Sequence, residues 1–264
     1  MPIGLSDKVI LITGGSRGLG RVMALGLAEA GARVAIVARP GSEAKLAEVV
    51  AQGSGRISPF TCDVADADAC AALVDRVLQH FGALHVLFNN AAVGMVELGP
   101  HVSRVVPFWE IPVDLWHRVV EANVNGPFHM ARIATRQMLA QGWGRIVNLS
   151  TGMRTMVKIG FSPYGPSKAA VEAMTAVWAQ DLAGTGVTVN ALLPGWVSDT
   201  DMVLAQDFPD RSKLVPPAAM VAPARWLASE DSNGVTGMRI IARDWDAALA
   251  PAEAFKAAAT KAAW

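Results

Sequence analysis

Seven short runs of apolar, often β-branched residues recur along the chain, separated by segments long enough to form helices. Most of these runs are apolar at every position instead of alternately, which is typical of strands covered on both faces. Because parallel strands need long crossover connections, this alternation predicts a doubly wound parallel α/β sheet of about seven strands in one domain spanning residues 1–264. The expected strands are residues 9–13, 33–38, 57–62, 84–88, 145–149, 187–193 and 238–242.

The first expected strand runs directly into a glycine-rich turn, Thr13-Gly14-Gly15-Ser16-Arg17-Gly18-Leu19-Gly20, and a helical pattern follows over residues 21–30. Glycines permit a tight turn and a close backbone approach to a ligand, and free N–H groups at a helix start attract phosphate. In this strand, turn and helix setting, the spacing favours a Rossmann-type dinucleotide site over a purely structural turn. The Gly-Lys-Ser/Thr ending of a nucleoside-triphosphate loop is absent.

The second expected strand ends at Ala38-Arg39. A chain that binds NAD usually carries an acidic residue here for the ribose hydroxyl, and this chain has none. Arg17 and Arg39 can instead pair with a 2′-phosphate, so the sequence predicts a preference for NADP(H) over NAD(H). The alternative is that both arginines are simply solvated.

Tyr164 is the only tyrosine of the chain, which otherwise contains eight tryptophans and eight phenylalanines. Lys168 follows four residues later, beside a helical run over residues 167–182, so both side chains can share one helix face. A phenol has a pKa near 10, and an ammonium group at about 4 Å favours its phenolate by on the order of 4 kcal/mol. The spacing predicts an acid/base pair in which Lys168 lowers the pKa of Tyr164. The alternative is a half-buried tyrosine beside a solvated lysine.

Together with several further motifs in order, these features resemble the short-chain dehydrogenase/reductase family, in its short single-domain branch, over residues 6–243. The further motifs are Asp63-Val64, Asn89-Asn90-Ala91-Ala92, Asn123 within Ala122-Asn123-Val124-Asn125-Gly126, and Pro194-Gly195. The resemblance implies that Asn123, Thr151, Tyr164 and Lys168 are catalytic. It implies a cofactor site made by Gly14, Ser16, Arg17, Gly18, Leu19, Gly20, Ala38, Arg39, Asp63, Val64, Asn90, Ala91, Tyr164, Lys168, Pro194, Gly195, Val197 and Thr200.

The catalytic hydroxyl is the first departure from the family pattern. Thr151 lies thirteen residues before Tyr164, where the family usually places this hydroxyl, and its methyl group restricts the side chain. Ser150 is the rival, but neighbours along a strand point to opposite faces, so only one of the two can serve. We expect Thr151 to serve and Ser150 to bind backbone.

Other departures affect the rim of the site. Ala92 replaces an expected glycine, and Ser198 and Thr200 flank the position after Pro194 where the family often has a threonine. The run Ala242-Arg243-Asp244-Trp245 stands where family members often have Asp-Gly-Gly. The substrate wall or subunit contact at the end of the last strand is therefore expected to differ.

The expected reaction is hydride exchange between nicotinamide and a carbonyl or secondary alcohol, with Tyr164 moving the proton. Lys168 would hold the ribose hydroxyls, Thr151 would orient the substrate oxygen, and Asn123 would position a proton-relay water. One alternative is a non-catalytic nucleotide-sensing scaffold on the same fold. Another is an epimerase or dehydratase that recycles its nicotinamide internally.

Two stretches interrupt the alternation and read as long loops, residues 93–112 and 196–217. Both follow strand ends, where open α/β sheets bind ligands, so they are candidate substrate loops or a lid; the alternative is an ordinary surface excursion or a subunit contact. Candidate pocket residues suggest an apolar or aromatic substrate, although they could equally belong to the core. They are Val93, Met153, Phe161, Trp196 and Met202.

Composition bounds the partners and the compartment. Charged residues are 17% of the chain, below the roughly 25% of typical soluble proteins, and the helical stretches 115–141 and 167–182 suggest helix-face association. A homodimer or homotetramer is expected. Balanced counts of 23 basic and 23 acidic residues disfavour nucleic acid and membrane partners. Two cysteines and no recognisable signal favour the cytoplasm, and the five histidines form no metal pattern. The Ala-rich tail, residues 251–263, is expected to form a helix or to fray.

Overall fold

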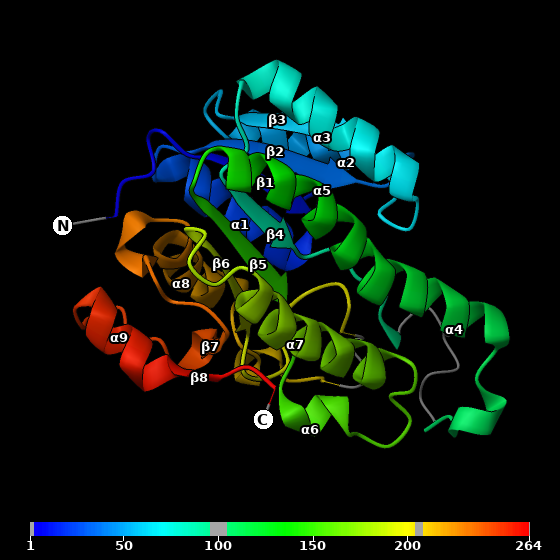
Figure 1. Ribbon diagram of the computed structural model, residues 1–264. Helices are drawn as coiled ribbons and strands as arrows, with labels where there is room; N and C mark the ends of the chain where they lie inside the picture. Colours follow the sequence, from blue (N-terminus) through cyan, green and yellow to red (C-terminus); the bar gives the residue numbers. More distant parts are fainter. Residues whose placement is uncertain (1–2, 96–104, 204–207, 264) are drawn as a thin grey trace.

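In a computed structural model that describes residues 3–95, 105–203 and 208–263, one sheet of eight strands has the order β3-β2-β1-β4-β5-β6-β7-β8 (Figure 1). The pairs from β3 to β7 are parallel, and strand order reverses between β1 and β4, as in a doubly wound Rossmann sheet. The predicted fold class is confirmed. The strands are β1 (Val9–Thr13), β2 (Arg33–Ala38), β3 (Ile57–Thr61), β4 (Val86–Asn89), β5 (Gly144–Leu149), β6 (Val187–Leu193), β7 (Met238–Ile241) and β8 (Ala259–Lys261).

Helices cover both faces of the sheet (Figure 1). Helices α1, α2, α8 and α9 pack on one face, and α3, α5 and α7 pack on the other. Their bounds are α1 (Gly18–Glu29), α2 (Glu43–Gln52), α3 (Ala67–Phe81), α4 (Val113–Val120), α5 (Gly126–Ala140), α6 (Met153–Met156), α7 (Tyr164–Asp181), α8 (Val221–Leu227) and α9 (Pro251–Ala258).

Two apolar cores lie between these layers. Successive strand residues point to opposite faces, so in β1 the side chains of Ile10 and Ile12 join the α1 core while Leu11 joins the α5 core. All five residues of β1 are buried, which explains why its sequence is apolar without alternation. The strands therefore form a rigid base whose carboxyl ends open onto one edge.

The C-terminal tail forms the expected helix and then adds a strand that the sequence did not predict. Residues 251–258 form α9, but residues 259–261 then form β8, which pairs antiparallel with β7. Without β8, the outer backbone groups of β7 would lie unpaired at the edge of the sheet, and the tail supplies their partners. The sequence gives little sign of this strand, since Ala259, Thr260 and Lys261 include only one β-branched residue.

The described parts of the two long loops contain no strand and only short helical turns. Residues 105–112 include the 3-10 turn η3 (Phe108–Glu110), and residues 196–203 and 208–217 include η5 (Arg211–Lys213) and the start of η6 (Pro217–Met220). Residues 96–104 and 204–207 lie outside the described part of the chain. Between α4 and α5 the helix widens into one π-helical segment, η4 (Glu121–Asn125).

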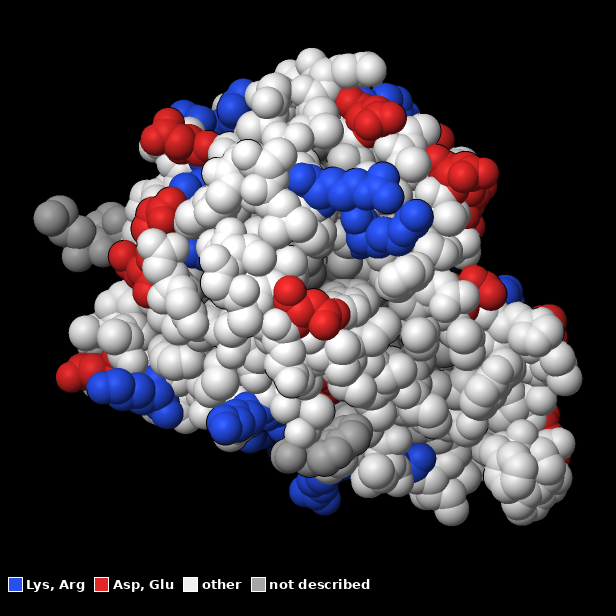
Figure 2. Space-filling view, viewed as in Figure 1, with Lys and Arg blue, Asp and Glu red and all other residues white. Residues whose placement is uncertain are grey.

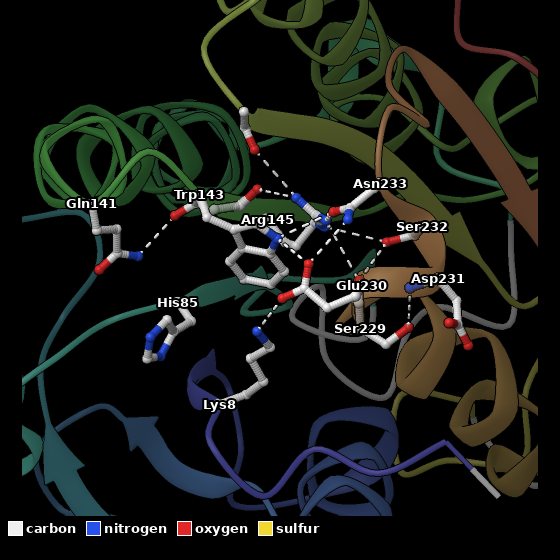
Figure 3. A network of polar contacts seen from close by, with 12 residues as sticks. Lys8, His85, Gln141, Trp143, Arg145, Ser229, Glu230, Asp231, Ser232 and Asn233 are labelled. Carbon is white, nitrogen blue, oxygen red and sulfur yellow. Dashed lines mark hydrogen bonds and ion pairs between the residues drawn. The ribbon is translucent and has the colours of Figure 1, made fainter.

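A polar cluster fixes the amino ends of the strands (Figure 3). Arg145, at the start of β5, is 1% exposed and stacks on the Trp143 ring at 4.0 Å from its centroid. Lys8 lies 4.0 Å from the same centroid and pairs with Glu230 at 2.5 Å, and Trp143 Nε1 donates to Glu230 at 2.9 Å. Arg145 also donates to Asn233 and, at 3.2 Å, to the Ser232 hydroxyl. This amino-end clamp joins the start of the chain, β5 and the turn η7 (Glu230–Ser232).

No helix within residues 3–95, 105–203 and 208–263 combines the length and the apolar character needed to cross a membrane.

Candidate active site

The predicted site residues gather at the carboxyl edge of the sheet, because parallel strands all end there. Gly14 follows β1, Asn90 follows β4, Thr151 follows β5 and Pro194 follows β6. Tyr164 and Lys168 reach the same edge from the first two turns of α7. Residues far apart in the sequence thus surround one opening.

The glycine-rich turn has the shape of a phosphate cradle. Gly14 has a φ of 68°, and a Cβ added there would lie 2.9 Å from the Ala91 Cα; a Cβ on Gly20 would lie 2.3 Å from the Gly14 carbonyl oxygen. Helix α1 begins with no side-chain cap at Arg17 and no acidic residue in its first turn. Its first N–H groups are therefore open to an anion. Ser16 and Leu19 lie partly exposed on the same turn.

Asn90 braces this cradle from the neighbouring strand. Its Nδ2 donates to the carbonyl oxygens of Thr13 at 2.8 Å and Gly14 at 3.0 Å. The backbone N–H groups of Asn90 and Ala91 both donate to the Thr13 hydroxyl at 3.0 Å. The turn is held in place before any ligand arrives.

The residues predicted to contact the adenine side of the cofactor are Ala38, Arg39 and the loop after β3. Ala38 is buried at the end of β2, whereas Arg39 and Arg17 are exposed and form no ion pair in the described part of the chain. Asp63 uses one carboxylate oxygen to accept the Ala65 N–H at 3.0 Å. Val64 is 7% exposed and packs toward Gly126 at the start of α5.

Tyr164 and Lys168 lie together at the start of α7. The Lys168 Nζ is 5.9 Å from the centroid of the Tyr164 ring and donates to the Leu149 carbonyl oxygen at 2.8 Å. The Phe161 ring meets the Tyr164 ring edge-on at 6.4 Å. The Tyr164 hydroxyl makes no hydrogen bond with any described residue, so it is free to meet a ligand.

The direction of the Tyr164 pKa corrects the expectation from the sequence. Burial raises the pKa of Tyr164 to about 12, and burial also lowers the pKa of Lys168 from 10.5 to about 8. Desolvation therefore outweighs the attraction between phenolate and ammonium that the spacing suggested. At neutral pH the ligand-free protein holds a neutral phenol beside a mostly protonated lysine.

Asn123 lies in the π-helical segment η4 and is fully buried. Its Oδ1 accepts the Val93 N–H at 2.7 Å, and its Nδ2 donates to the Val93 carbonyl at 3.0 Å and to the Ser167 hydroxyl at 3.1 Å. Ser167 in turn donates to the Tyr164 carbonyl at 2.7 Å. The widened turn, a feature often found at functional sites, thus links the loop after β4 to the first turn of α7.

Ser150 and Thr151 point to different surroundings, as expected for neighbours at a strand end. The Ser150 hydroxyl donates to the Glu172 carboxylate at 2.8 Å within the core, so the expected backbone partner is wrong and the partner is a buried side chain. Glu172 is 1% exposed and pairs with Arg239 at 3.2 Å, and Arg239 donates to the Thr151 carbonyl at 3.3 Å. Thr151 is partly exposed, and its hydroxyl makes no hydrogen bond with a described residue.

Sequence reasoning missed three residues that build this region, namely Ser167, Glu172 and Arg239. Ser167 could have been found because it lies in the same helical turn as Tyr164 and Lys168. Glu172 lies one turn beyond Lys168, and a carboxylate on a buried helix face signals a partner. Its partner Arg239 comes from β7, and no local pattern connects the two positions.

The loop after β6 lies against the glycine cradle and against the loop after β4. A Cβ on Gly18 would lie 3.5 Å from the Thr200 methyl, and a Cβ on Gly94 would lie 2.9 Å from the Met202 side chain. Ser198 is buried in a bridge to Val215, and the Val197 carbonyl accepts the Val215 N–H at 2.9 Å. Of the two candidate hydroxyls after Pro194, Thr200 therefore lies by the cradle.

The candidate pocket residues divide between two places. Met153 and Trp196 line one cleft of about 170 Å³ beside Leu193, and both are exposed. Met202 lies against Gly94, next to Val93. Phe161 sits beside Tyr164. In the described part of the chain, no cluster of three His, Cys, Asp or Glu side chains could hold a metal ion.

Comparisons with known proteins agree with this geometry. The family model for short chain dehydrogenase matches residues 8–208. The 3-oxoacyl-(acyl-carrier-protein) reductase FabG of Staphylococcus aureus is 34% identical over 244 residues, which are 88% of this chain and 95% of that protein.

Solved structures extend the likeness to the fold. A short-chain type dehydrogenase/reductase from Mycobacterium marinum has a TM-score of 0.77 and 30% identity, covering 90% of this chain and 94% of that one. A gluconate 5-dehydrogenase from Burkholderia cenocepacia, in complex with NADP and tartrate, has a TM-score of 0.79 and 28% identity, with the same coverage of 90% and 94%. This chain therefore belongs to the short-chain dehydrogenase/reductase family and is an NAD(P)-dependent oxidoreductase.

Proposed function

We propose that this protein is an NADP(H)-preferring oxidoreductase that acts on a carbonyl or secondary alcohol of a small, apolar or aromatic molecule. The observation that carries the proposal is the convergence of Asn123, Thr151, Tyr164 and Lys168 at the carboxyl edge of the sheet, beside an uncapped glycine cradle. When bound, the nicotinamide supplies or accepts the hydride.

Tyr164 moves the proton in this proposal. With a pKa of about 12 it is a neutral phenol at pH 7, which is the form that donates a proton to a developing alkoxide during reduction. Lys168 carries its charge below a pKa of about 8, and this charge favours the phenolate that remains. Because Lys168 uses one hydrogen bond on Leu149, its other N–H groups can hold ribose hydroxyls.

Thr151 orients the substrate oxygen, since its hydroxyl has no partner among the described residues. The Ser150 hydroxyl is engaged with Glu172, which supports a structural role for Ser150. Asn123 ties the loop after β4 to α7 and positions a proton-relay water beside Lys168.

Cofactor preference rests on Arg17 and Arg39. Arg39 follows the end of β2 and Arg17 precedes the first residue of α1, and both are exposed. The end of β2 carries no Asp or Glu that would favour a ribose 2′-hydroxyl. The two guanidinium groups suit a 2′-phosphate. The glycine turn, Asp63, Val64, Asn90, Ala91, Pro194, Gly195, Val197 and Thr200 would hold the remainder of the cofactor.

The loops after β4 and β6, residues 93–112 and 196–217, would enclose the substrate. Trp196 and Met153 line a cleft next to Thr151, and Met202 comes from the second loop to meet the first at Gly94. These side chains offer apolar and aromatic contact surface for the part of the substrate beyond its reacting carbon.

A homodimer or homotetramer built on helix faces completes the proposal. Trp116 on α4, Phe128 on α5 and Val177 on α7 are 42%, 47% and 53% exposed. Figure 2 shows that the surface over α4 and α7 carries few charges. An apolar face of this kind is typical of subunit contacts. The two free, buried cysteines support a cytoplasmic location.

A panel of ketones and alcohols, assayed with both nicotinamides, tests the proposal. Net oxidoreduction predicts one nicotinamide converted per substrate, followed by the near-ultraviolet absorbance of the reduced ring. An epimerase or dehydratase would change its substrate without net cofactor conversion, and a nucleotide-sensing scaffold would bind cofactor with no turnover. Either result would contradict the proposal.

Charge reversal at Arg39 tests the cofactor preference. Arg39→Glu removes a partner of the 2′-phosphate and adds repulsion, so kcat/KM for NADPH should fall by about tenfold or more while that for NADH is unchanged or rises. Lys45→Glu, a charge reversal at an exposed position on α2, is the matched control and should leave the ratio unchanged. Equal loss with both nicotinamides would refute the assignment.

A further inference from the structure

A larger cleft adjoins the small one beside Thr151. It has a volume of about 710 Å³ and lies between the turn after β6, the segment after η5 and the turn after β7. The two clefts share Arg154, Gly195 and Trp196 as lining residues, and the small one extends to Gly152. Arg239, which also lines the small cleft, donates to the Thr151 carbonyl at 3.3 Å, so the two clefts begin beside the backbone of Thr151.

Three cations line the larger cleft, namely Arg154, Lys213 and Arg243. Among the described residues, no Asp or Glu lines either cleft. Arg154 forms no ion pair in the described part of the chain, and its guanidinium lies 5.6 Å from the centroid of the Trp196 ring. A lining of one sign next to low-dielectric walls concentrates an attractive potential for anions.

Arg243 lies against Pro194 and Gly195, in the part of the lining formed by the turn after β6. Its backbone N–H donates to the Pro194 carbonyl at 3.1 Å, and a Cβ on Gly195 would lie 3.2 Å from the Arg243 Cβ and 3.7 Å from its Nε. The side chain is thus held over the turn that follows β6. It belongs to the run Ala242-Arg243-Asp244-Trp245, which stands where family members often have Asp-Gly-Gly, so this chain places a guanidinium group at this wall.

The apolar part of the cleft and its net charge define the ligand further. Leu214 and Val215 are each 6% exposed and form a wall with Pro216 and the Trp196 ring. Asp244 pairs with Arg243 and Asp210 pairs with Lys213, each at 3.2 Å, from outside the lining. These two acids offset two of the three cations, which leaves a single positive charge and matches a carboxylate better than a phosphate dianion.

We propose that the substrate is an apolar or aromatic carbonyl compound, or the matching secondary alcohol, that carries a carboxylate bound by Arg154 and Arg243. This inference rests on the proposed function, because it assigns the substrate class of the same site. The carbonyl lies at Thr151 and Tyr164, the apolar body lies along Trp196 and Val215, and the carboxylate lies between the two guanidinium groups.

Matched acids and esters test this assignment. Benzoylpropionate, benzoylbutyrate and benzoylvalerate, each with its methyl ester, vary the distance from ketone to carboxylate at nearly constant apolar surface. With NADPH, the best acid should exceed its ester in kcat/KM by about tenfold or more, because a charge-assisted hydrogen bond is lost in the ester. Arg154→Gln and Arg243→Gln should each remove most of this ratio while leaving the ester unchanged.

Controls separate this inference from the proposed function. Lys256→Gln changes an exposed lysine on α9 that lines neither cleft, and should leave the ratio intact. Calorimetric titration of phenylbutyrate, which has no ketone, into the NADP-bound protein should give heat that disappears in the double variant of Arg154 and Arg243. Equal kcat/KM for acids and esters would overturn the carboxylate assignment while the oxidoreductase stands. Loss of NADPH affinity in the arginine variants, with no change in the acid to ester ratio, would overturn it too.

Discussion

At the amino end of the sheet Arg145 is buried among many partners, whereas at the carboxyl end Lys168 is buried with one. Arg145 stacks on Trp143 and donates to Asn233, Ser232 and backbone carbonyls. Lys168, 4% exposed, donates to the Leu149 carbonyl and to no other described residue. Burial lowers the pKa of both, to about 10 for Arg145 and about 8 for Lys168.

Arg145 therefore stabilises the fold, whereas Lys168 keeps hydrogen-bond donors available for a ligand. The guanidinium donors of Arg145 are used within the protein, so the cost of its burial is offset by hydrogen bonds and stacking. An ammonium group has three N–H donors, and Lys168 uses one of them in a hydrogen bond within the protein. The Tyr164 and Thr151 hydroxyls are similarly without partners among the described residues. At the carboxyl end the cost of burying these polar groups is therefore offset less by hydrogen bonds than it is in the clamp.

The largest expected effect comes from removing the phenolic oxygen at the carboxyl end. Tyr164→Phe keeps the ring that meets Phe161 but removes the proton donor, so kcat should fall by about 10²–10⁴. Calorimetric titration should give unchanged NADPH affinity, and urea unfolding should give unchanged stability. Wild-type turnover in this variant would show that Tyr164 is not the proton donor. It would also contradict the view that the carboxyl end of the sheet is the catalytic end.

The next effect should appear at the amino end, in stability and not in turnover. Arg145→Met leaves the polar groups of Asn233 and Ser232 without their buried donor, and should lower the free energy of unfolding by about 2–4 kcal/mol. The kcat per folded molecule should stay at the wild-type value. Arg56→Met, at an exposed arginine with one backbone hydrogen bond, is the control and should change stability by less than about 0.5 kcal/mol. A drop in kcat for Arg145→Met would show that the two ends are not independent.

Local patterns in the sequence were enough to predict strands β1 to β7 and to select candidate site residues that lie at one edge of the sheet. The buried strands read directly as apolar runs, and the site residues follow because parallel strands end at one edge. Tyr164 and Lys168 needed only their spacing of one helical turn.

Features that depend on distant partners could not be predicted in this way. The β8 strand forms because β7 has an open edge, although its own residues have weak strand preference. The pair of Glu172 and Arg239 joins α7 to β7, and the rise in the Tyr164 pKa depends on burial in the folded protein. The spacing of Tyr164 and Lys168 predicted a lowered Tyr164 pKa, and this direction was wrong. Spacing indicates that two groups lie close together, but it does not show how deeply they are buried.

The smallest expected change in stability is a gain on removing the buried lysine. Lowering the Lys168 pKa from 10.5 to about 8 destabilises the charged form in the folded protein by roughly 3 kcal/mol at pH 7. The hydrogen bond to the Leu149 carbonyl offsets about 1 kcal/mol of this cost. Lys168→Met should therefore raise the free energy of unfolding by about 1–2 kcal/mol at pH 7, while NADPH affinity and turnover are lost.

The most direct test is the free energy of unfolding of wild type and Lys168→Met, measured by urea at matched protein concentration at neutral pH and near pH 10. Between the folded pKa of about 8 and the unfolded value of 10.5, the unfolded wild-type chain binds more protons than the folded protein. Its stability should therefore rise relative to the variant as pH increases through that window. The variant should be more stable at pH 7, and this advantage should shrink by pH 10. A variant less stable at pH 7, or a difference that does not depend on pH, would contradict the claim that the site holds its lysine at a cost to the fold.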